Sequence, residues 1–307
     1  MENNIKYICC ILLGIFSASL QAQQDPGYTQ YMYNTLTVNS AYAGSTGTLD
    51  ATLLHRSQWV GMDGAPKTQA FTIHSPLSNE NIGLGFSAIN DKIGPSDELY
   101  LEGNFSYTVA LSFDKKLAFG LKAGARMLNI DWSKGIYRDP VDALLNTNIN
   151  NQVKPSLGAG IYLHTDNWYL GASVPSFIRN NYYDDVQETV SYDRLHYYFM
   201  GGYVFNFSDN LKFKPAFLAK AATGTPVTVD VSANFLIQEK VTAGVSYRWD
   251  DSVSALAGFQ LSRSFFVGYS YDYTVSDLNK YNNGSHEIIL RYQLQKKANQ
   301  IKSPRFF

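Results

Sequence analysis

Residues 28–77 read YTQYMYNTLTVNSAYAGSTGTLDATLLHRSQWVGMDGAPKTQAFTIHSPL and contain two kinds of structure. Residues 28–44 are rich in tyrosine and asparagine and end at a glycine, which predicts an ordered irregular segment and not a helix. Residues 49–59 and 67–77 are extended, and the glycines and proline of residues 61–66 give the chain a place to turn. The second half of the stretch is therefore predicted to be a β-hairpin.

The second arm of this hairpin has one apolar and one polar face. Because side chains alternate along a strand, Phe71 and Ile73 fall on one face, and Thr72 and His74 fall on the other. The same alternation recurs along the chain in segments of about ten residues. The predicted strands are residues 49–59, 67–77, 82–90, 99–109, 117–130, 153–164, 167–175, 195–207, 211–220, 227–237, 241–249, 253–262, 264–274 and 285–294.

The predicted connections alternate in length. The short ones are 78–81, 112–115, 165–166, 208–210, 238–240 and 262–263, and the longer ones are 60–66, 131–152, 176–194 and 275–284. Short periplasmic turns and long extracellular loops are typical of outer-membrane barrels. We therefore predict an all-β fold, a transmembrane antiparallel up-and-down β-barrel of about 14 strands in the bacterial outer membrane with both termini periplasmic. A secreted sandwich or propeller would also have many short strands. A sandwich, however, has no reason to place short turns at one end and long loops at the other, and no blade-length repeat supports a propeller.

Composition narrows the class of protein further. The chain has 25 Lys+Arg and 26 Asp+Glu, a balance that argues against nucleic acid as a partner. Residues 1–22 contain Lys6, an apolar run and small residues before Ala22, which predicts a secretory signal peptide. Both cysteines, Cys9 and Cys10, lie in that peptide, so the mature chain is expected to fold without a disulfide.

The two ends of the mature chain fall outside the predicted strands. We expect an irregular N-terminal segment (23–45), which is a plug or a periplasmic docking element, a barrel (46–294) that contacts outer-membrane lipid, and a periplasmic tail (295–307). A barrel of about 14 strands leaves space inside that the N-terminal segment can fill. The tail ends in two aromatic residues and a carboxylate, which suits capture by a pocket. The candidate docking residues are Tyr28, Tyr31, Tyr33, Asn34, Asn39, Tyr42, Pro304, Arg305, Phe306 and Phe307.

The polar faces of the strands carry charges of both signs. If the apolar faces meet lipid, the polar faces line the bore. Mixed charges can pair across a bore and hold it closed, whereas a selective pore tends to carry one sign. The predicted lumen charges are Arg56, Glu102, Lys122, Arg126, Asp230, Arg248, Asp272, Glu287 and Arg291.

No catalytic or metal-binding pattern is evident in the sequence. The five histidines are scattered, and neither an HExxH nor a GxSxG motif occurs. We therefore predict a protein that is not an enzyme and that has no cofactor and no metal site. A hydrolase site assembled from distant strands, as in outer-membrane proteases and lipases, is the enzymatic alternative.

Several long motifs carry a family resemblance. They are DPGYTQYMYNTLTVNSAYAG (25–44), RSQWVGMDGAPKTQAFTIHSPL (56–77), INDKIGP (89–95), SYDYTVSDLNKYNNGSHEIILRY (270–292) and SPRFF (303–307). Together they resemble the PorP/SprF family of Bacteroidota over the whole mature chain. The tail ends in Arg-Phe-Phe where the family usually has Arg-Tyr-Phe, a change that keeps the aromatic character.

The resemblance implies a non-enzymatic outer-membrane component of the type IX secretion system, in some species linked to gliding motility. It also implies two kinds of partner. These are secreted cargo with a C-terminal sorting domain, including large surface adhesins, and the periplasmic ring of the machine or its linking lipoproteins. The alternative function is an outer-membrane channel for a small polar or hydrophobic solute, since barrels of similar strand number with an N-terminal plug can have that role.

Overall fold

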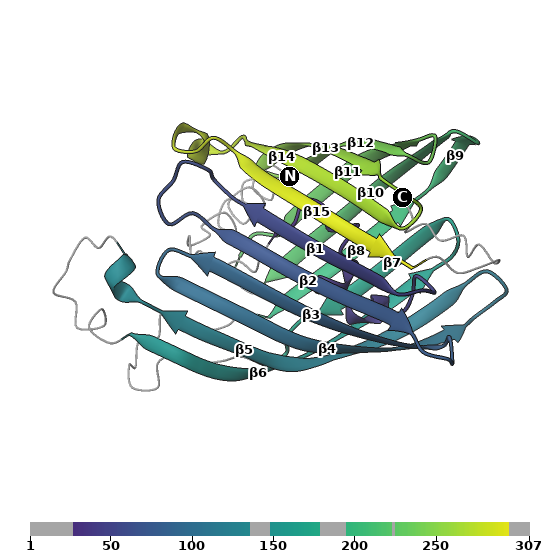
Figure 1. Ribbon diagram of the computed structural model, residues 1–307, viewed down its shortest axis with the longest axis horizontal. Coiled ribbons are helices and arrows are strands. Elements are labelled where there is room, and N and C mark those ends of the chain that lie inside the picture. The colour runs from purple at the N-terminus through teal and green to yellow at the C-terminus, as the bar shows by residue number, and fades with distance from the viewer. Residues whose placement is uncertain (1–26, 136–147, 179–194, 223–224, 295–307) are drawn as a thin grey trace, which may run out of the picture.

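The computed structural model describes residues 27–135, 148–178, 195–222 and 225–294. These residues form one antiparallel sheet whose strands follow each other around a ring (Figure 1). The strands are β1 Asp50–Ser57, β2 Lys67–Pro76, β3 Ile82–Ile93, β4 Ser96–Ala110, β5 Lys116–Ile130, β6 Ile149–His164, β7 Trp168–Val174, β8 His196–Tyr203, β9 Phe205–Ser208, β10 Leu211–Ala222, β11 Thr228–Ile237, β12 Val241–Arg248, β13 Ser252–Gln260, β14 Phe265–Thr274 and β15 Ser285–Gln293.

The sheet closes on itself. β1 pairs with β15, and β10 pairs with both β8 and β11, so each strand continues to a neighbour on either side. β8 and β9 are two parts of one strand, separated by Val204, because both pair with β10. The protein is therefore a closed antiparallel barrel of 14 strands, which confirms the predicted fold class. No helix in the described ranges is long and apolar enough to cross a membrane.

The two rims of the barrel differ in their connections. At the rim that we call the short-turn end, β1 begins, β15 ends and the turns after β2, β4, β6, β9, β11 and β13 lie. At the opposite rim, the long-loop end, β1, β5, β7 and β14 end, and the connections that follow them in the sequence are residues 58–66, 131–148, 175–195 and 275–284. Short connections occur at this rim too: residues 249–251 join β12 to β13, and β3 and β4 are longer than predicted and leave only Gly94 and Pro95 between them. Gly94 has a φ of 54°, a left-handed conformation that permits such a tight hairpin.

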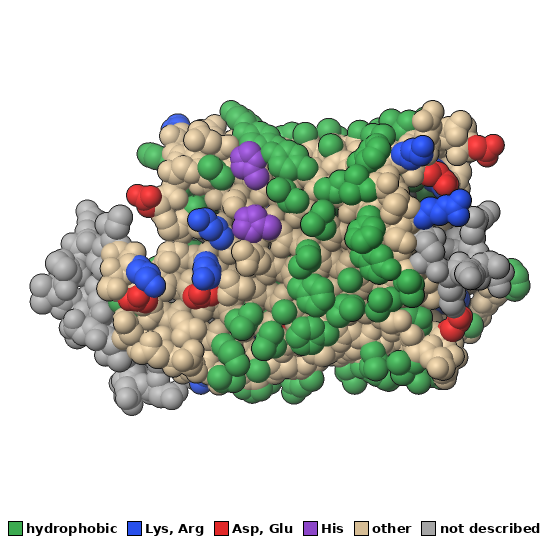
Figure 2. Space-filling view, viewed as in Figure 1, with side chains coloured by type: hydrophobic (Ala, Val, Ile, Leu, Met, Phe, Trp, Pro, Cys, Tyr) green, Lys and Arg blue, Asp and Glu red, His purple; other side chains and the backbone are tan. Residues whose placement is uncertain are grey.

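The wall of the barrel is apolar outside and polar inside. On β12, Val241 and Val245 are exposed, whereas Thr242 and Ser246 are buried. The same parity holds on β2, where Thr68, Thr72 and His74 point inward. Figure 2 shows apolar side chains spread over the outer surface, with more polar and charged side chains toward the ends. A wall of this kind is stable where its outer face contacts hydrocarbon.

Residues 27–46, which we call the plug, lie inside the barrel. Their side chains are almost all buried, and they include two single-turn 3₁₀ helices, η1 (Thr35–Thr37) and η2 (Ser40–Tyr42). The plug leads through residues 47–49 into β1 at the short-turn end. Its other end, Gly27, lies beside the guanidinium of Arg248, at the end of β12 that faces the long-loop end. The plug therefore runs through much of the length of the bore.

Candidate functional site: the plugged bore

Asn39 holds the middle of the plug in its fold and attaches it to the wall. Its side-chain oxygen accepts a hydrogen bond from the Ala41 N–H at 3.0 Å, which caps η2. Its side-chain amide donates to the carbonyl of Ile161 on β6 at 3.0 Å. After η2 the chain turns at Gly44, whose φ of 69° favours glycine. The side chain of Asn39 thus makes one hydrogen bond within the plug and one to the wall.

The first turn of the plug is held by a group of charged side chains on β1, β14 and β15. The carboxylate of Glu287 accepts hydrogen bonds from the backbone N–H groups of Thr29 at 3.0 Å and Gln30 at 2.8 Å. The hydroxyl of Thr29 donates to Asp272 at 2.7 Å. Arg56 makes ion pairs with Asp272 at 2.7 Å and with Glu287 at 3.1 Å. We call these three charged residues the latch, because they fix one end of the plug to three strands.

Further hydrogen bonds attach the rest of the plug to the wall. Most run from wall hydroxyl groups to plug acceptors, and three of them pair plug backbone groups that are buried in the bore, as buried backbone groups require. Ser173 donates to the Val38 carbonyl at 2.6 Å, Ser106 to the Ala43 carbonyl at 2.7 Å and Thr72 to the Asn34 side-chain oxygen at 2.8 Å, while the Gly44 N–H donates to Nδ1 of His74 at 3.2 Å.

Wall glycines let the plug backbone approach the strands closely. A Cβ at Gly120 on β5 would lie closer than 3.0 Å to the backbone of Ala41, and one at Gly83 on β3 would meet the Ala43 carbonyl in the same way. Gly160 on β6 faces the Asn39 side chain with equally little room. Glycine in a strand often marks such a close backbone approach. At these three positions, the inner wall therefore has room for the plug only because the wall residue is glycine.

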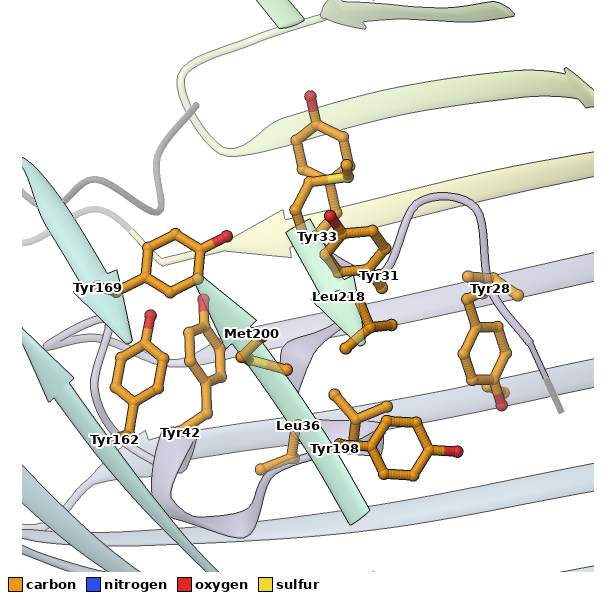
Figure 3. Close-up of a cluster of buried hydrophobic side chains, with 14 of the residues drawn as sticks. Tyr28, Tyr31, Tyr33, Leu36, Tyr42, Tyr162, Tyr169, Tyr198, Met200 and Leu218 are labelled. Carbon is orange, nitrogen blue, oxygen red and sulfur yellow. The ribbon is translucent and has the colours of Figure 1, made fainter. Parts of the chain in front are cut away.

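Tyrosines fill the remaining space between the plug and the wall. Tyr42 packs edge to face on Tyr162 with ring centroids 5.6 Å apart, and Tyr162 stacks on Tyr169 at 5.7 Å. Figure 3 shows Tyr31, Tyr33 and Leu36 of the plug beside Met200 and Leu218 of the wall. Burial raises the pKa of Tyr33, which lies in the plug and not in a strand, to about 12. The shift arises because the charged phenolate would lose its hydration in the filled bore.

The nine predicted lumen charges all lie on inward positions of the strands. Seven are buried, and Arg126 and Arg248 are partly buried. Their pairs are Arg56 with Asp272 and Glu287, Lys122 with Glu102, Arg126 with Glu98, Arg248 with Asp230 and Asp251, and Arg291 with Asp50. The bore thus contains several separate ion-pair groups distributed around the wall.

Sequence reasoning missed three partners in these pairs, Asp50, Glu98 and Asp251. Asp50 has the same strand parity as Arg56, a signal that could have placed it in the bore. Glu98 precedes the predicted start of its strand, because β4 begins at Ser96 and not at residue 99. Asp251 lies in the β12–β13 turn, where alternation gives no direction.

The candidate docking residues fall into two groups. Tyr28, Tyr31, Tyr33, Asn34, Asn39 and Tyr42 are at most 7% exposed, so no partner can reach these side chains while the plug occupies the bore. Pro304, Arg305, Phe306 and Phe307 lie outside the described residues, as does the predicted signal peptide. A docking role for either group stays a prediction. In the described part of the chain, no group of three or more His, Cys, Asp or Glu side chains could hold a metal ion.

Comparison with known proteins identifies the family. The profile of the type IX secretion system membrane protein PorP/SprF matches residues 20–292, which is most of the chain and includes the plug and the barrel. The chain belongs to the PorP/SprF family. A search of curated proteins gives no sequence match. Membership makes this PorP/SprF protein an outer-membrane barrel associated with the type IX secretion machinery and points to a protein that is not an enzyme.

Three solved structures are among those similar to this barrel. The CymD monoaromatic hydrocarbon channel is 11% identical, with 92% of this chain and 95% of that chain covered and a TM-score of 0.53. A Pseudomonas aeruginosa FadL homologue is 13% identical, with 90% and 96% covered and a TM-score of 0.48. Omp33 of Acinetobacter baumannii is 10% identical, with 81% and 100% covered and a TM-score of 0.43. At this level of identity the similarity to CymD concerns the fold alone.

Proposed function

We propose that this PorP/SprF protein is a closed outer-membrane anchor of the type IX secretion system that supports the export or surface display of specific cargo. The cargo is a secreted protein with a C-terminal sorting domain, such as a large surface adhesin used in gliding. The observation that carries the proposal is the plug: a family member of the secretion system has a bore filled by its own chain. A filled bore favours a docking role over conduction.

The way in which the plug is held supports this reading. Its backbone is hydrogen-bonded by Glu287 and by hydroxyl groups of several strands, and wall glycines match its path. A segment that must leave the bore in each transport cycle would lose all of these contacts together. The lumen charges are of both signs and paired, which does not resemble the single-sign lining of a selective pore.

We further propose that the short-turn end faces the periplasm. Short periplasmic turns and longer extracellular loops are the usual arrangement of these barrels. β15 ends at this rim, so the tail of residues 295–307 would start on the periplasmic side, where ring components or linking lipoproteins can reach it. The first described residue, Gly27, lies beside Arg248, toward the long-loop end.

A pull-down tests the docking role. The tagged protein is solubilised from outer membranes in mild detergent, and the co-purifying proteins are identified by mass spectrometry. We expect ring lipoproteins or one large secreted protein with a C-terminal sorting domain. The matched variant lacks residues 303–307: it should insert and fold normally but recover less of the periplasmic partner and export less cargo. Normal recovery and normal export by this variant would remove the tail from the mechanism.

Single-channel recording in a planar bilayer tests whether the bore is closed. We expect no steady conductance from the unmodified protein, because the plug fills the bore. Steady conductance that a small or hydrophobic solute blocks, together with a barrel that purifies without partners, would replace the proposal with the solute-channel alternative. That role is the one named for CymD.

A further inference from the structure

A pocket opens at the short-turn end, outside the bore. It has a volume of about 370 Å³ and lies between residues 47–49, which join the plug to β1, residues 75–80 at the β2–β3 turn, and Leu294 at the end of β15. Three parts of the chain that are distant in sequence thus meet around one cavity. Its size falls in the range of pockets that hold small ligands or a few residues of peptide.

The lining of the pocket includes both apolar and polar residues. Leu49, Pro76, Leu77 and Leu294 are the apolar ones, and Leu77 and Leu294 remain 45% and 49% exposed. The polar ones include Ser75, Ser78 and Glu80. A short peptide with an aromatic side chain next to a basic residue would match both kinds of residue.

We propose that this pocket binds the end of the protein's own C-terminal tail, with Phe306 or Phe307 against the leucines and the basic residues of the tail near Glu80. The tail starts at the pocket itself, since Leu294 is part of the lining. Thirteen residues follow Leu294, and they can span about 40 Å when extended, which is ample for the chain to turn back. Residues 295–307 contain Lys296, Lys297, Lys302 and Arg305 and no acidic side chain.

Covalent attachment favours the protein's own tail over a separate peptide as the occupant of the pocket. A segment joined to the rim of its own site by a short stretch of chain has an effective concentration on the order of millimolar. A peptide of weak intrinsic affinity therefore stays bound in cis unless a partner competes for the tail. The pocket would then act as a holding site, from which the tail is released when a periplasmic component binds it. Binding of the tail in the isolated barrel goes beyond the proposed function, and only its release by a periplasmic component rests on that function.

Engineered cysteines test the proposal on purified protein in detergent. Both native cysteines lie in residues 1–22, so a mature chain cleaved there carries only the introduced pair. Ser78→Cys, at the pocket, is combined with Ser303→Cys, next to the aromatic end of the tail. The control combines Ser303→Cys with Ser112→Cys, an exposed position in the β4–β5 turn on the same rim. Disulfide formation under mild oxidation is measured by mass spectrometry of non-reduced peptides, after the heat-dependent gel shift has shown that each variant is folded.

We expect the Ser78 pair to cross-link at least ten times faster than the Ser112 pair. Adding Phe306→Ala and Phe307→Ala to the Ser78 pair should reduce its rate to that of the control. Equal rates for the two pairs, or a rate for the Ser78 pair that does not change when both phenylalanines are removed, would overturn the proposal and leave the pocket to a lipid or to another protein. The assay contains no secretion components, so its failure would leave the pull-down result unaffected.

Discussion

Asp50 and Arg291 form an ion pair across the seam at which the barrel closes. Asp50 is the first residue of β1 and Arg291 lies near the end of β15, so the two ends of the barrel sequence meet at this contact. Nε of Arg291 donates to both carboxylate oxygens of Asp50, at 3.0 and 3.2 Å, and Nη2 donates to one of them. Both side chains are buried. The pair forms in the register in which Thr52 of β1 lies opposite Arg291 of β15.

Breaking this pair should destabilise the barrel. Asp50→Asn leaves Arg291 buried without its counter-charge, and removing one partner of a buried pair costs about 3–5 kcal/mol. We expect the temperature at which the folded band disappears in a gel-shift assay to fall clearly. The control is Glu239→Gln, which breaks the more exposed pair with Lys212 and should change stability by at most about 0.5 kcal/mol. A similar melting temperature for wild type and Asp50→Asn would show that strand pairing alone sets the seam.

Weakening the latch should loosen the plug without unfolding the barrel. In Glu287→Gln the amide can accept from one plug N–H but not replace both carboxylate oxygens, and it cannot pair with Arg56 as an ion. A loss of about 3 kcal/mol would raise the undocked fraction of the plug on the order of 100-fold. We expect brief conductance events in a planar bilayer and faster protease cleavage within residues 27–46.

The matched control for the latch is Glu102→Gln. Glu102 is also buried and pairs with Lys122 at 2.8 Å, and it accepts hydrogen bonds from Ser87 and Ser156, which belong to the wall and not to the plug. This variant should lose stability while its plug stays protected from protease. If Glu102→Gln and Glu287→Gln released the plug to the same extent, the latch would not be the element that holds it.

Strand alternation, together with short turns at one end and longer loops at the other, was enough to predict the fold. Alternation also predicts which charged side chains face the bore. It assigns Arg56 and Glu287 to the bore because parity along each strand is a local property. The pairing of those charges is not local: Arg56 meets Asp272 and Glu287 only because the barrel closes between β1 and β15. A sequence pattern contains the parity of each strand but not the register across the seam.

The place of the N-terminal segment could be narrowed to two alternatives but not decided from the sequence. Its tyrosines are suited equally to a buried plug and to a docking surface, since both bury aromatic rings. The decisive feature is the fit between the plug and glycines on separate strands, such as Gly120 opposite Ala41. In the sequence these glycines look like ordinary strand glycines, because nothing local shows which backbone lies over them.

This fit gives a direct test of the plug position. Gly120→Ala places a methyl group against the backbone of Ala41, where there is no room, so the plug must shift. We expect a loss of about 1–3 kcal/mol, as for overpacking in a core, and faster proteolysis of the plug. Gly103→Ala on β4 is the control, because the nearest atom to its added Cβ is 3.7 Å away, an ordinary contact. Equal protection of the plug in both variants would argue against close packing at Gly120.

Contact between the outer face and lipid can be tested by placing a lysine at two different depths on that face, in two separate variants. Val245 lies in the middle of β12 and is 59% exposed, while Val227 lies just before β11, at the long-loop end, and is 58% exposed. Lysine on the lipid face costs about 2–4 kcal/mol at the middle of the bilayer and about 0–1 kcal/mol near its surface. We expect Val245→Lys to reduce insertion into lipid vesicles strongly and Val227→Lys to leave it nearly unchanged. Because the two side chains are equally exposed, a difference reports depth in the membrane and not accessibility. Equal insertion of both variants would mean that this face of the barrel does not lie in hydrocarbon.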